Sequence, residues 1–337
     1  MAFPDRQKRN VGPLLLTKNF NRRKKMSKKK ETVAVHNMSK AQWTWHLMKQ
    51  YKAGYFMTIP FMILFFTFTV IPVFASVFVA FTDWNLLQTP NFVGFQNFIT
   101  LFLNDDLFIT ALKNTILFAV VVGPGSYIMS FVIAWLINEL DPKVRAFVTL
   151  VFYAPSLTTS AFTIFQYIFS SDAYGLVNGW LMNFGLIDAP IRFFQTEQYI
   201  FPLCIIISLW MSLNTGFLAS IAGLQGVDRA QYEAAAVDGI TNRWQELWYV
   251  TLPNMKETLM FSAVLSITGA FGFGGIVTSM AGDPPTGYVG YTLTHHLGEY
   301  SGARMEFGYA SAISFVLFLI QIGANMAINR ALSKVGK

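Results

Sequence analysis

Residues 54–81 read GYFMTIPFMILFFTFTVIPVFASVFVAF and contain no Asp, Glu, Lys or Arg. A helix needs about 20 apolar residues to cross a hydrocarbon core of about 30 Å, so this stretch is long enough to span a membrane. Five further uncharged, apolar stretches of sufficient length occupy 114–138, 147–170, 199–222, 258–281 and 307–329. Because these runs do not alternate, and because backbone groups in lipid must pair internally, helices are favoured over barrel strands. The sequence predicts an all-α polytopic membrane protein with about six transmembrane helices.

The basic residues predict the orientation of the chain. Fourteen of the 25 Lys and Arg residues lie within residues 1–54, and with six spans 22 of the 25 fall on one side of the membrane. The other side carries only Lys113, Arg192 and Arg304. By the positive-inside rule, we expect both termini in the cytoplasm. This distribution accounts for the net charge of +7 without a nucleic-acid partner.

We divide the chain into a basic cytoplasmic N-terminal segment (1–53), a transmembrane domain (54–330) with a cytoplasmic loop at 225–256, and a cytoplasmic tail (331–337). The first apolar stretch begins only near Gly54 and lacks a small-residue cleavage pattern, so we expect it to remain as a span and not to be removed as a signal peptide. The basic segment is typical of a topogenic tail that contacts lipid, with an interaction tail for a specific partner as the alternative.

The 225–256 loop is polar and predicts two short helices. Three alanines, 234–236, follow Glu233, whose carboxylate near the helix start would complement the helix dipole, and Asp238-Gly239 is a stop signal. Trp244, Leu247, Trp248, Thr251 and Leu252 then recur at helical spacing and form one stripe, which we expect Pro253 to end at the membrane. Two helices meeting at a glycine would project as a knob toward a soluble partner. The alternative is a loop that packs on its own helix bundle.

Three stretches carry a resemblance to a known family. They are Glu-Ala-Ala (233–235) followed by Gly239 and Leu252-Pro253, the outer stretch Phe81-Thr82-Asp83-Trp84-Asn85 with Phe-Val-Gly-Phe-Gln-Asn-Phe at 92–98, and Phe-Gly-Tyr-Ala-Ser-Ala at 307–312. Over residues 54–330 the chain resembles permease subunits of bacterial binding-protein-dependent ABC importers, of the carbohydrate-uptake type that handles maltose or glycerol-phosphate. It departs from the family where a second proline often follows Leu-Pro, since Asn254 and Met255 stand there.

The resemblance implies the following partners and place in the cell. A second, homologous permease would complete a heterodimer in the bacterial plasma (inner) membrane, with two ATPase subunits inside and a solute-binding protein outside. The residues that would enter a cleft of the ATPase subunit are Glu233, Ala234, Ala235, Asp238 and Gly239. The chain has no G-x-x-x-x-G-K-[ST] loop, so it is expected to have no cofactor and no enzymatic activity of its own, and ATP and Mg would act in the partner subunits.

The substrate path is the least determined part of the sequence. Candidates inside the spans are the aromatic and amide side chains Gln166, Tyr167, Trp210, Asn214, Phe271 and Phe273, each of which is also consistent with packing. Trp210 and Asn214 are four residues apart, which predicts one shared helical face. The Gly-rich stretch 269–275 suggests a groove between two exposed Phe rings or close helix packing. The absence of charge in the spans favours a neutral sugar over glycerol-phosphate or an acidic saccharide.

Two other functional classes fit less well. An ion-coupled secondary carrier that uses protons would bury a carboxylate, and the six spans have none. An intramembrane enzyme would need a nucleophile with a base; His295 and His296 lie together in an outer loop without a partner arranged for catalysis, and we interpret them as an exposed pair and not as a catalytic or metal site. Cys204 is the single cysteine and is expected to be a small buried hydrophobic residue.

Overall fold

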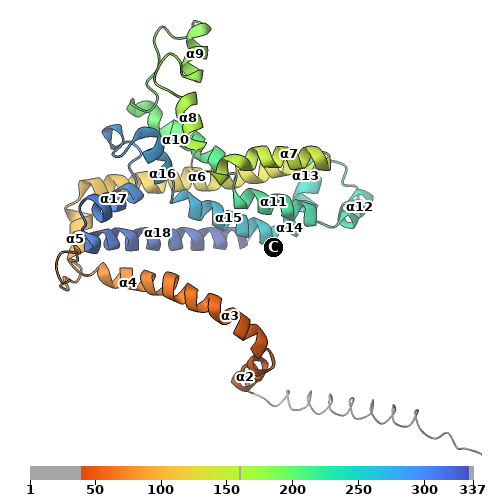
Figure 1. Cartoon of the computed structure of the whole chain (residues 1–337). Coiled ribbons are helices and arrows are strands. Elements are labelled where there is room, and N and C mark those ends of the chain that lie inside the picture. Colours follow the sequence, from red (N-terminus) through yellow and green to blue (C-terminus); the bar gives the residue numbers. More distant parts are fainter. Residues whose placement is uncertain (1–38, 159–160, 334–337) are drawn as a thin grey trace, which may run out of the picture. The chain divides into compact units, whose positions relative to one another are not determined.

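The computed structural model describes residues 39–158 and 161–333 (Figure 1). The first 38 residues of the predicted basic segment and residues 334–337 of the predicted tail lie outside the described residues. The chain divides into two compact units, Met1–Val73 and Phe74–Lys337. Within the described ranges every named element is helical, and the only extended pairing is a single bridge between Thr82 and Phe92. The all-α prediction is confirmed.

The first unit contains α2 (Lys40–Gln50), α3 (Lys52–Phe65), the π-helical turn Phe66–Val70 and the start of α4 (Ile71–Val79). The helices that follow in the second unit are α5 (Gln96–Leu103), α6 (Asp106–Asn138), α7 (Pro142–Tyr153), α8 (Ala161–Ile168), α9 (Leu176–Asn183), α10 (Glu197–Met211), α11 (Thr215–Gly226), α12 (Arg229–Val237), α13 (Arg243–Glu246), α14 (Leu252–Asn254), α15 (Lys256–Ala270), α16 (Gly274–Ala281), α17 (Leu293–Gly298) and α18 (Phe307–Ser333).

Six spans are accounted for by length and composition. Three helices are long and apolar enough to cross a membrane: Lys52–Val79, Asp106–Asn138 and Phe307–Ala331. Three helix pairs pass the same test when each bent pair is taken as one span: α7 with α8, bent by 92° across a break that contains the undescribed residues 159–160, α10 with α11, bent by 43°, and α15 with α16, bent by 45°. The predicted stretches are thus confirmed, with the second and third helices starting earlier than expected, at Asp106 and Pro142.

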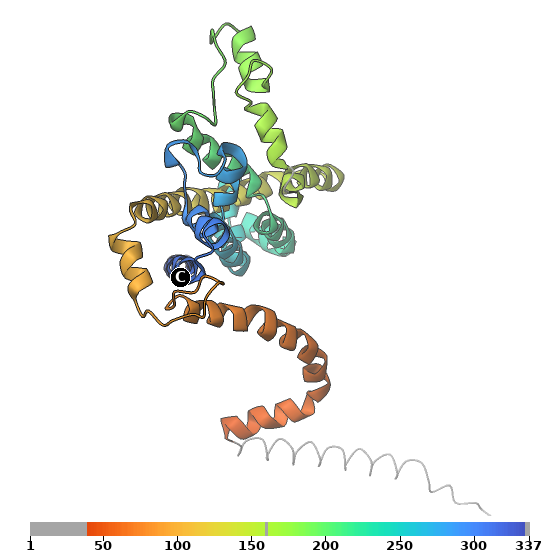
Figure 2. The ribbon, with the colours of Figure 1, turned by 60° about the vertical axis from the view of Figure 1, so that its left-hand side comes forward.

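Helix α6 is the central element of the second unit. The carboxylate of Asp105 caps its first turn by accepting the Phe108 N–H at 2.9 Å, which pairs a backbone donor that the helix leaves free. Its buried side chains recur every three or four residues and so form one continuous stripe: Phe108, Ala111, Thr115, Phe118, Val122, Ser126, Ser130, Ala134 and Ile137. Helices α10, α11, α15 and α17 pack against it (Figures 1 and 2).

The core follows α6 as three successive clusters. Phe108 packs with Tyr291, Leu293 and Ile313 at one end; Phe118 and Val122 pack with Ile200 and Ile207 of α10 in the middle; Ala134 and Ile137 pack with Phe217, Met255 and Leu259 at the other end. Cys204 is completely buried in the middle cluster, as predicted. At 33 residues, α6 is about 50 Å long, so one helix joins the two ends of the bundle.

Candidate functional sites

The 225–256 loop begins with the short helix that the sequence predicted. Asp228 is the N-cap of α12, and its carboxylate accepts the Ala230 N–H at 3.0 Å. The helix ends at Val237, and Gly239 follows with φ +94°, a conformation that a side chain would strain. Glu233 is not at the helix start, because Asp228 supplies the carboxylate there; Glu233 instead forms an exposed ion pair with Arg229 at 3.5 Å.

The five residues assigned to coupling do not share one environment. Glu233, Ala234, Asp238 and Gly239 are exposed, whereas Ala235 is buried and faces the bundle. Ala235 therefore lets the loop approach the helices behind it, and the other four form the outer surface. Beside them lies Val237, with 87% of its surface exposed. The loop combines the two alternatives left by the sequence, since it packs on its own bundle with one face and presents the other.

The second helix of the loop differs from its prediction. Residues Leu247–Thr251 form a π-helical turn between α13 and α14, which adds a residue to the turn and rotates the side chains that follow. Leu247 and Thr251 are buried, while Trp244 and Trp248 are about 60% exposed, so the predicted single stripe is split between two faces. Pro253 does not end the helix either, because it occupies the first turn of α14, where a missing N–H costs nothing, and the chain turns at Met255.

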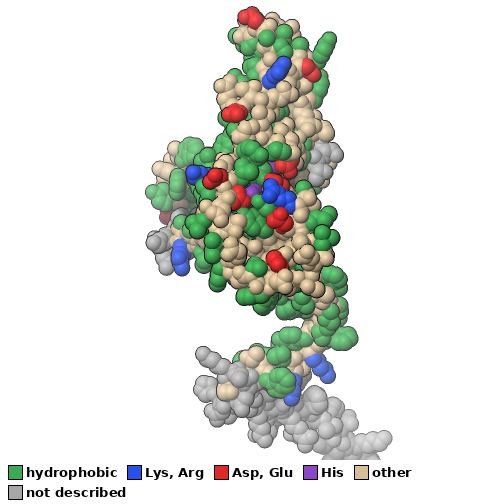
Figure 3. All heavy atoms as spheres, turned by 90° about the vertical axis from the view of Figure 1, so that its left-hand side faces the viewer, with side chains coloured by type: hydrophobic (Ala, Val, Ile, Leu, Met, Phe, Trp, Pro, Cys, Tyr) green, Lys and Arg blue, Asp and Glu red, His purple; other side chains and the backbone are tan. Residues whose placement is uncertain are grey.

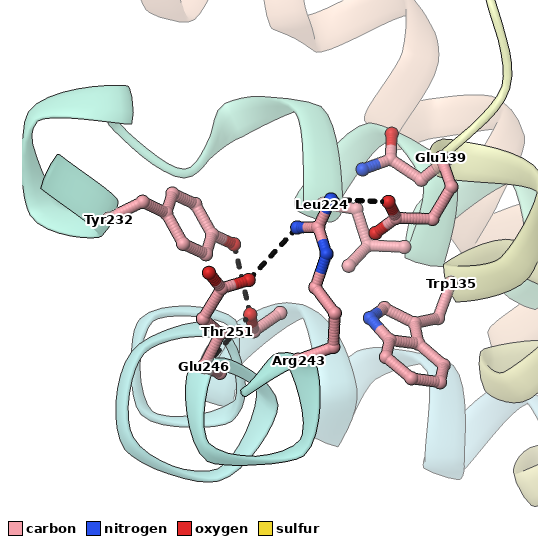
Figure 4. A pocket seen from close by; sticks show the side chains of 8 residues that line it. Trp135, Glu139, Leu224, Tyr232, Arg243, Glu246 and Thr251 are labelled. Atoms are coloured by element: carbon pink, nitrogen blue, oxygen red, sulfur yellow. Dashed lines mark hydrogen bonds and ion pairs between the residues drawn. The ribbon is translucent and has the colours of Figure 1, made fainter. Parts of the chain in front are cut away.

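Arg243 fastens this loop to the end of α6 (Figure 4). Its Nη2 lies 2.7 Å from Oε2 of Glu139, directly after α6, and its Nη1 lies 2.9 Å from Oε2 of Glu246. The hydrogen bond to Glu246 and the charges of both carboxylates raise the pKa of Arg243 above its ordinary value, so the guanidinium stays charged. The Trp244 ring packs against Trp135 of α6 at a centroid distance of 5.2 Å.

A hollow of about 300 Å³ lies beneath this ion pair, and Tyr232 closes one side of it. The Tyr232 hydroxyl and the Thr251 hydroxyl are 2.9 Å apart and join the two halves of the loop. Sequence reasoning did not single out Arg243, Glu139 or Tyr232. The spacing of Arg243 and Glu246, three residues apart on a helix, was the available signal for part of the arrangement. Nothing local in the sequence connects Arg243 with Glu139, 104 residues away.

A second hollow, of about 250 Å³, lies where two spans are broken. The break between α10 and α11 and the break between α15 and α16 both border it, and Ser126 of α6 and Phe162 of α8 complete its wall. Irregular backbone at membrane depth is tolerated only where protein covers it or where it lines a cavity. Among the described residues its lining is uncharged and includes an amide, hydroxyls and two Phe rings: Ser126, Phe162, Ser212, Asn214, Ser266 and Phe273.

Two of the six predicted path residues border this hollow, Asn214 and Phe273. Trp210 does not, and its predicted face with Asn214 is wrong, because α10 ends at Met211 and Asn214 is the N-cap of α11, where its Oδ1 accepts the Gly216 N–H at 3.2 Å. An Asn side chain that accepts a hydrogen bond from a nearby backbone N–H favours the start of a new helix over the continuation of the preceding one. Trp210 packs on Phe152 at a centroid distance of 5.5 Å.

The other three path candidates lie elsewhere. Phe271 is buried and packs with Ala263 and Ile267, so the expectation of two exposed rings in the Gly-rich stretch is wrong for this one. Gln166 donates its Nε2 hydrogen to the carbonyl of Ser279 at 2.6 Å and so joins α8 to α16. Tyr167 is exposed outside the hollow. The stretch 269–275 bends between α15 and α16, as the sequence suggested for a lining segment.

The end of the bundle opposite the 225–256 loop holds a buried polar network, and Figure 3 shows acidic, basic and His side chains gathered there. His296 and His295 are 1% and 3% exposed in α17, so their interpretation as an exposed pair is wrong. Oδ2 of Asp105 lies 2.9 Å from His296 Nε2 and accepts a hydrogen bond from the Tyr309 hydroxyl at 2.8 Å. Tyr291 donates to Glu299 at 2.9 Å and lies 3.3 Å from His296 Nδ1.

Burial acts on two groups of this network in different ways. Desolvation alone would raise the pKa of Asp105, but the hydrogen bonds from Phe108 N–H and Tyr309 and the neighbouring His296 outweigh it and hold the pKa below its ordinary value. For His295, burial lowers the pKa of the imidazole. No group of three or more His, Cys, Asp or Glu suited to a metal ion occurs in the described part of the chain.

The two outer motifs of the sequence fold against each other at this end. Asn97 donates its Nδ2 hydrogens to the carbonyls of Ala80 and Thr82, and the Gly308 N–H donates to the Trp84 carbonyl at 2.9 Å. A Cβ at position 308 would collide with the Thr82 carbonyl, so glycine is required at this approach. These hydrogen bonds bring the stretches 81–85, 92–98 and 307–312 together.

Comparisons with known proteins agree with this architecture. Residues 128–330 match the family model described as binding-protein-dependent transport system inner membrane component. The chain is 31% identical to the probable ABC transporter permease protein YesP of Bacillus subtilis over 81% of its length and 88% of that protein, and 31% identical to the lactose transport system permease protein LacF of Rhizobium radiobacter over 68% and 77%.

A solved structure is also similar. It is a chain of a bacterial ABC transporter involved in the import of the acidic polysaccharide alginate, with a TM-score of 0.71, 23% sequence identity, and coverage of 87% of this chain and 99% of that one. At this identity the likeness supports the fold. With the family model covering more than half of the chain, the protein belongs to the inner membrane components of binding-protein-dependent transport systems.

Proposed function

We propose that this chain is a permease subunit of an ATP-driven sugar importer and forms half of its translocation pathway. The observation that carries the proposal is the pairing of an exposed loop at one end of α6 with an uncharged hollow farther along the same helix. The loop offers a surface to a soluble partner, and the hollow offers hydroxyl, amide and aromatic groups. Membership of the family of binding-protein-dependent transport components supports a role for the loop in partner contact and for the hollow in transport.

The chemistry of the hollow favours a neutral saccharide. Sugars are recognised by hydroxyl and amide groups that exchange hydrogen bonds, and by rings on which they stack, and Asn214, Ser212 and Phe273 provide these. A glycerol-phosphate or acidic saccharide would call for a cation, and the described lining has none. The names of two relatives, transport system permeases for lactose and for arabinooligosaccharides, agree with this choice.

The proposed mechanism is alternating access with the energy supplied by partners. The partners are a second, homologous permease, two ATPase subunits that bind ATP and Mg, and an extracytoplasmic solute-binding protein. Closure of the ATPase subunits would displace the loop through Glu233, Ala234, Asp238 and Gly239. Arg243 and Trp244 would pass this displacement to the end of α6, and rigid-body motion of α6 would change the opening of the hollow.

Two substitutions in the loop test coupling. Glu233→Lys reverses a charge on the exposed face, and Gly239→Pro imposes a negative φ where the chain needs +94°. We expect both variants to insert normally and to lose ATP-driven sugar uptake in proteoliposomes with the partner subunits. The control is Asp188→Lys, a charge reversal in an exposed loop that the predicted topology places outside the membrane. This variant should transport normally. Normal uptake and ATPase association in both loop variants would overturn the coupling assignment.

A conservative change at Asn214 tests the hollow separately. Asn214→Ser keeps a short side-chain acceptor at the N-cap of α11 but removes the amide from the hollow. We expect a weaker apparent affinity for sugar with unchanged basal ATP hydrolysis. Trp210→Ala, which removes a ring that packs on Phe152 outside the hollow, should lower thermal stability and leave the affinity unchanged. The reverse result would move the sugar path to the Trp210 side of the helix pair.

The orientation can be tested with an impermeant thiol reagent on intact cells. Cysteines introduced by Lys25→Cys and Asn242→Cys should be shielded, and one introduced by Trp180→Cys, in the exposed loop helix α9, should react. Labelling of residue 242 from outside would contradict a cytoplasmic loop and cytoplasmic termini.

A further inference from the structure

Helix α2 precedes the first span and turns away from it. Its last residue is Gln50, and Tyr51, with φ −101° and ψ 26°, separates it from α3. Figure 2 shows the chain changing direction between these two helices of the first unit. A span therefore begins directly after α2, which keeps α2 close to the membrane surface whatever its tilt.

The residues of α2 combine large apolar rings with positive charge. Trp43, Trp45 and Met48 are 38%, 59% and 38% exposed, and Tyr51 is 61% exposed. Lys49 Nζ lies 5.5 Å from the centre of the Trp45 ring, so the charged end and the ring occupy the same level of the helix. Trp and Lys together are the residues that settle at the boundary between acyl chains and headgroups, where one end of each side chain is apolar and the other polar.

Charge identifies the partner. Residues 1–54 contain 14 Lys and Arg but only two acidic residues, Asp5 and Glu31, whereas the remainder of the chain has more acidic than basic residues. Between Glu31 and Asp83 there is no acidic side chain at all. Anionic headgroups attract basic groups only within about 10 Å of the surface, a distance that α2, about 16 Å long, exceeds if it stands upright. Lying flat would satisfy both the charges and the rings.

We propose that α2 is an interfacial helix that lies on the membrane and binds anionic phospholipid, with Leu47 and Met48 toward the acyl chains and His46 and Lys49 toward water. This arrangement follows from helical spacing, because residues 43, 47 and 48 share one side of α2 and residues 45, 46 and 49 share the other, where the Trp45 ring lies beside Lys49 at the level of the headgroups. The proposal does not depend on the transported solute or on the side of the membrane, so its failure would leave the proposed function intact.

The test places spin labels on the full-length protein in lipid nanodiscs. In a Cys204→Ala background, single labels are introduced through Leu47→Cys, Met48→Cys, His46→Cys and Lys49→Cys. In nanodiscs that contain phosphatidylglycerol, labels at 47 and 48 should be accessible to oxygen and shielded from a water-soluble nickel reagent, and those at 46 and 49 should show the opposite. Access of the nickel reagent to all four labels, or shielding of all four from both reagents by a covering protein, would overturn the proposal.

Lipid composition and charge supply the second arm. In the variant labelled at residue 47, Lys49→Glu should lower the ratio of the lipid-embedded to the water-exposed spectral component by roughly thirtyfold in phosphatidylglycerol-containing nanodiscs. The substitution changes the charge by two units, so that anionic headgroups repel residue 49 where they attracted it. The effect should vanish in phosphatidylcholine alone. Lys143→Glu, at the start of α7, is the matched control and should change nothing. Equal spectra in both lipids for the unsubstituted helix would overturn the assignment to anionic lipid.

Discussion

The two ends of α6 are held by opposite kinds of contact. At its start, Asp105 and His296 have side chains that are 11% and 1% exposed, and Tyr309 and Phe108 complete the bonding of the carboxylate. At its end, Glu139 and Arg243 pair at a shorter distance but with side chains that are 40% and 64% exposed. The first contact is shielded from water, whereas in the second water can replace either partner.

This difference indicates how the ends can behave. Removing one partner from a buried pair leaves a charge or polar group uncompensated, whereas an exposed pair can open at little cost because water replaces the lost partner. The α17 end is therefore built to stay assembled. The end that carries the 225–256 loop can break and re-form its contact, as the proposed transport cycle requires of a surface that follows another protein.

The largest effect is expected for Asp105→Ala. The variant loses the N-cap of α6, the hydrogen bond from Tyr309 and the contact with His296 together. We expect the free energy of unfolding in detergent to fall by about 3 kcal/mol. Asp106→Ala, at the neighbouring exposed position, is the control and should cost less than about 1 kcal/mol. Equal losses for the two variants would mean that the buried network contributes nothing specific.

A somewhat smaller effect at the same end is expected for Gly308→Ala. The added methyl group would meet the Thr82 carbonyl, so the outer stretch must shift, at about 2 kcal/mol. Gly323→Ala in the same helix meets no atom within 4 Å and should be neutral or stabilising. Thermal unfolding of both variants measures the difference. If Gly323→Ala destabilises as much as Gly308→Ala, the close approach to Thr82 is not what requires glycine.

The sequence predicted the features that depend on local composition, and it missed those that depend on helix breaks and on contacts between residues far apart in the chain. Six spans and the helix ending before Gly239 follow from hydropathy and from a backbone position that only glycine tolerates, and both are found. The shared face of Trp210 and Asn214 was wrong because spacing assumes an unbroken helix, while Asn214 caps a new one. The predicted stripe of Trp248 with Leu247 and Thr251 was also wrong, because Trp248 is exposed and the other two are buried.

Polar partners were the other part that the sequence left undetermined. His295 and His296 were interpreted as an exposed pair because no carboxylate or cysteine arranged for catalysis lies beside them in the sequence. Each ring has one partner close in the chain, Thr292 for His295 and Tyr291 for His296. The other partners are distant: Asp105, at the start of α6, is more than 190 residues from His296, and Thr278 of α16 is 17 residues from His295. Such pairs are fixed by the packing of helices, and no periodicity in one segment reports them.

The next prediction concerns pH at the α17 end. Burial lowers the pKa of His295 in the folded protein below about 6.5, the value expected for an exposed imidazole, so the unfolded chain binds more protons at mildly acidic pH. Stability should therefore be complete above about pH 6.5 and decline as the pH falls toward the lowered pKa. His295→Gln should flatten this part of a pH series of thermal unfolding. An unchanged slope would show that His295 takes up its proton without cost.

The smallest stability effect is expected at the other end of α6, for the pair Arg243 and Glu139. Since both side chains are largely exposed, Arg243→Gln and Glu139→Gln should each change the free energy of unfolding by less than about 1 kcal/mol. Transport should respond more than stability, because the pair joins the loop to α6. We expect either change to lower sugar uptake per ATP hydrolysed in proteoliposomes.

A double-mutant cycle decides whether the two residues act as one contact. If they do, the double variant should transport no worse than either single one, because the second change removes a contact that is already broken. Glu246→Gln is the matched control: it removes the partner of Arg243 inside the loop and leaves the bridge to Glu139 in place, so uptake should fall less. Additive losses from Arg243→Gln and Glu139→Gln would show that each acts elsewhere. A loss of stability as large as that of Asp105→Ala would show that the two ends of α6 are held alike, and the contrast between a fixed and an exchangeable end would fail.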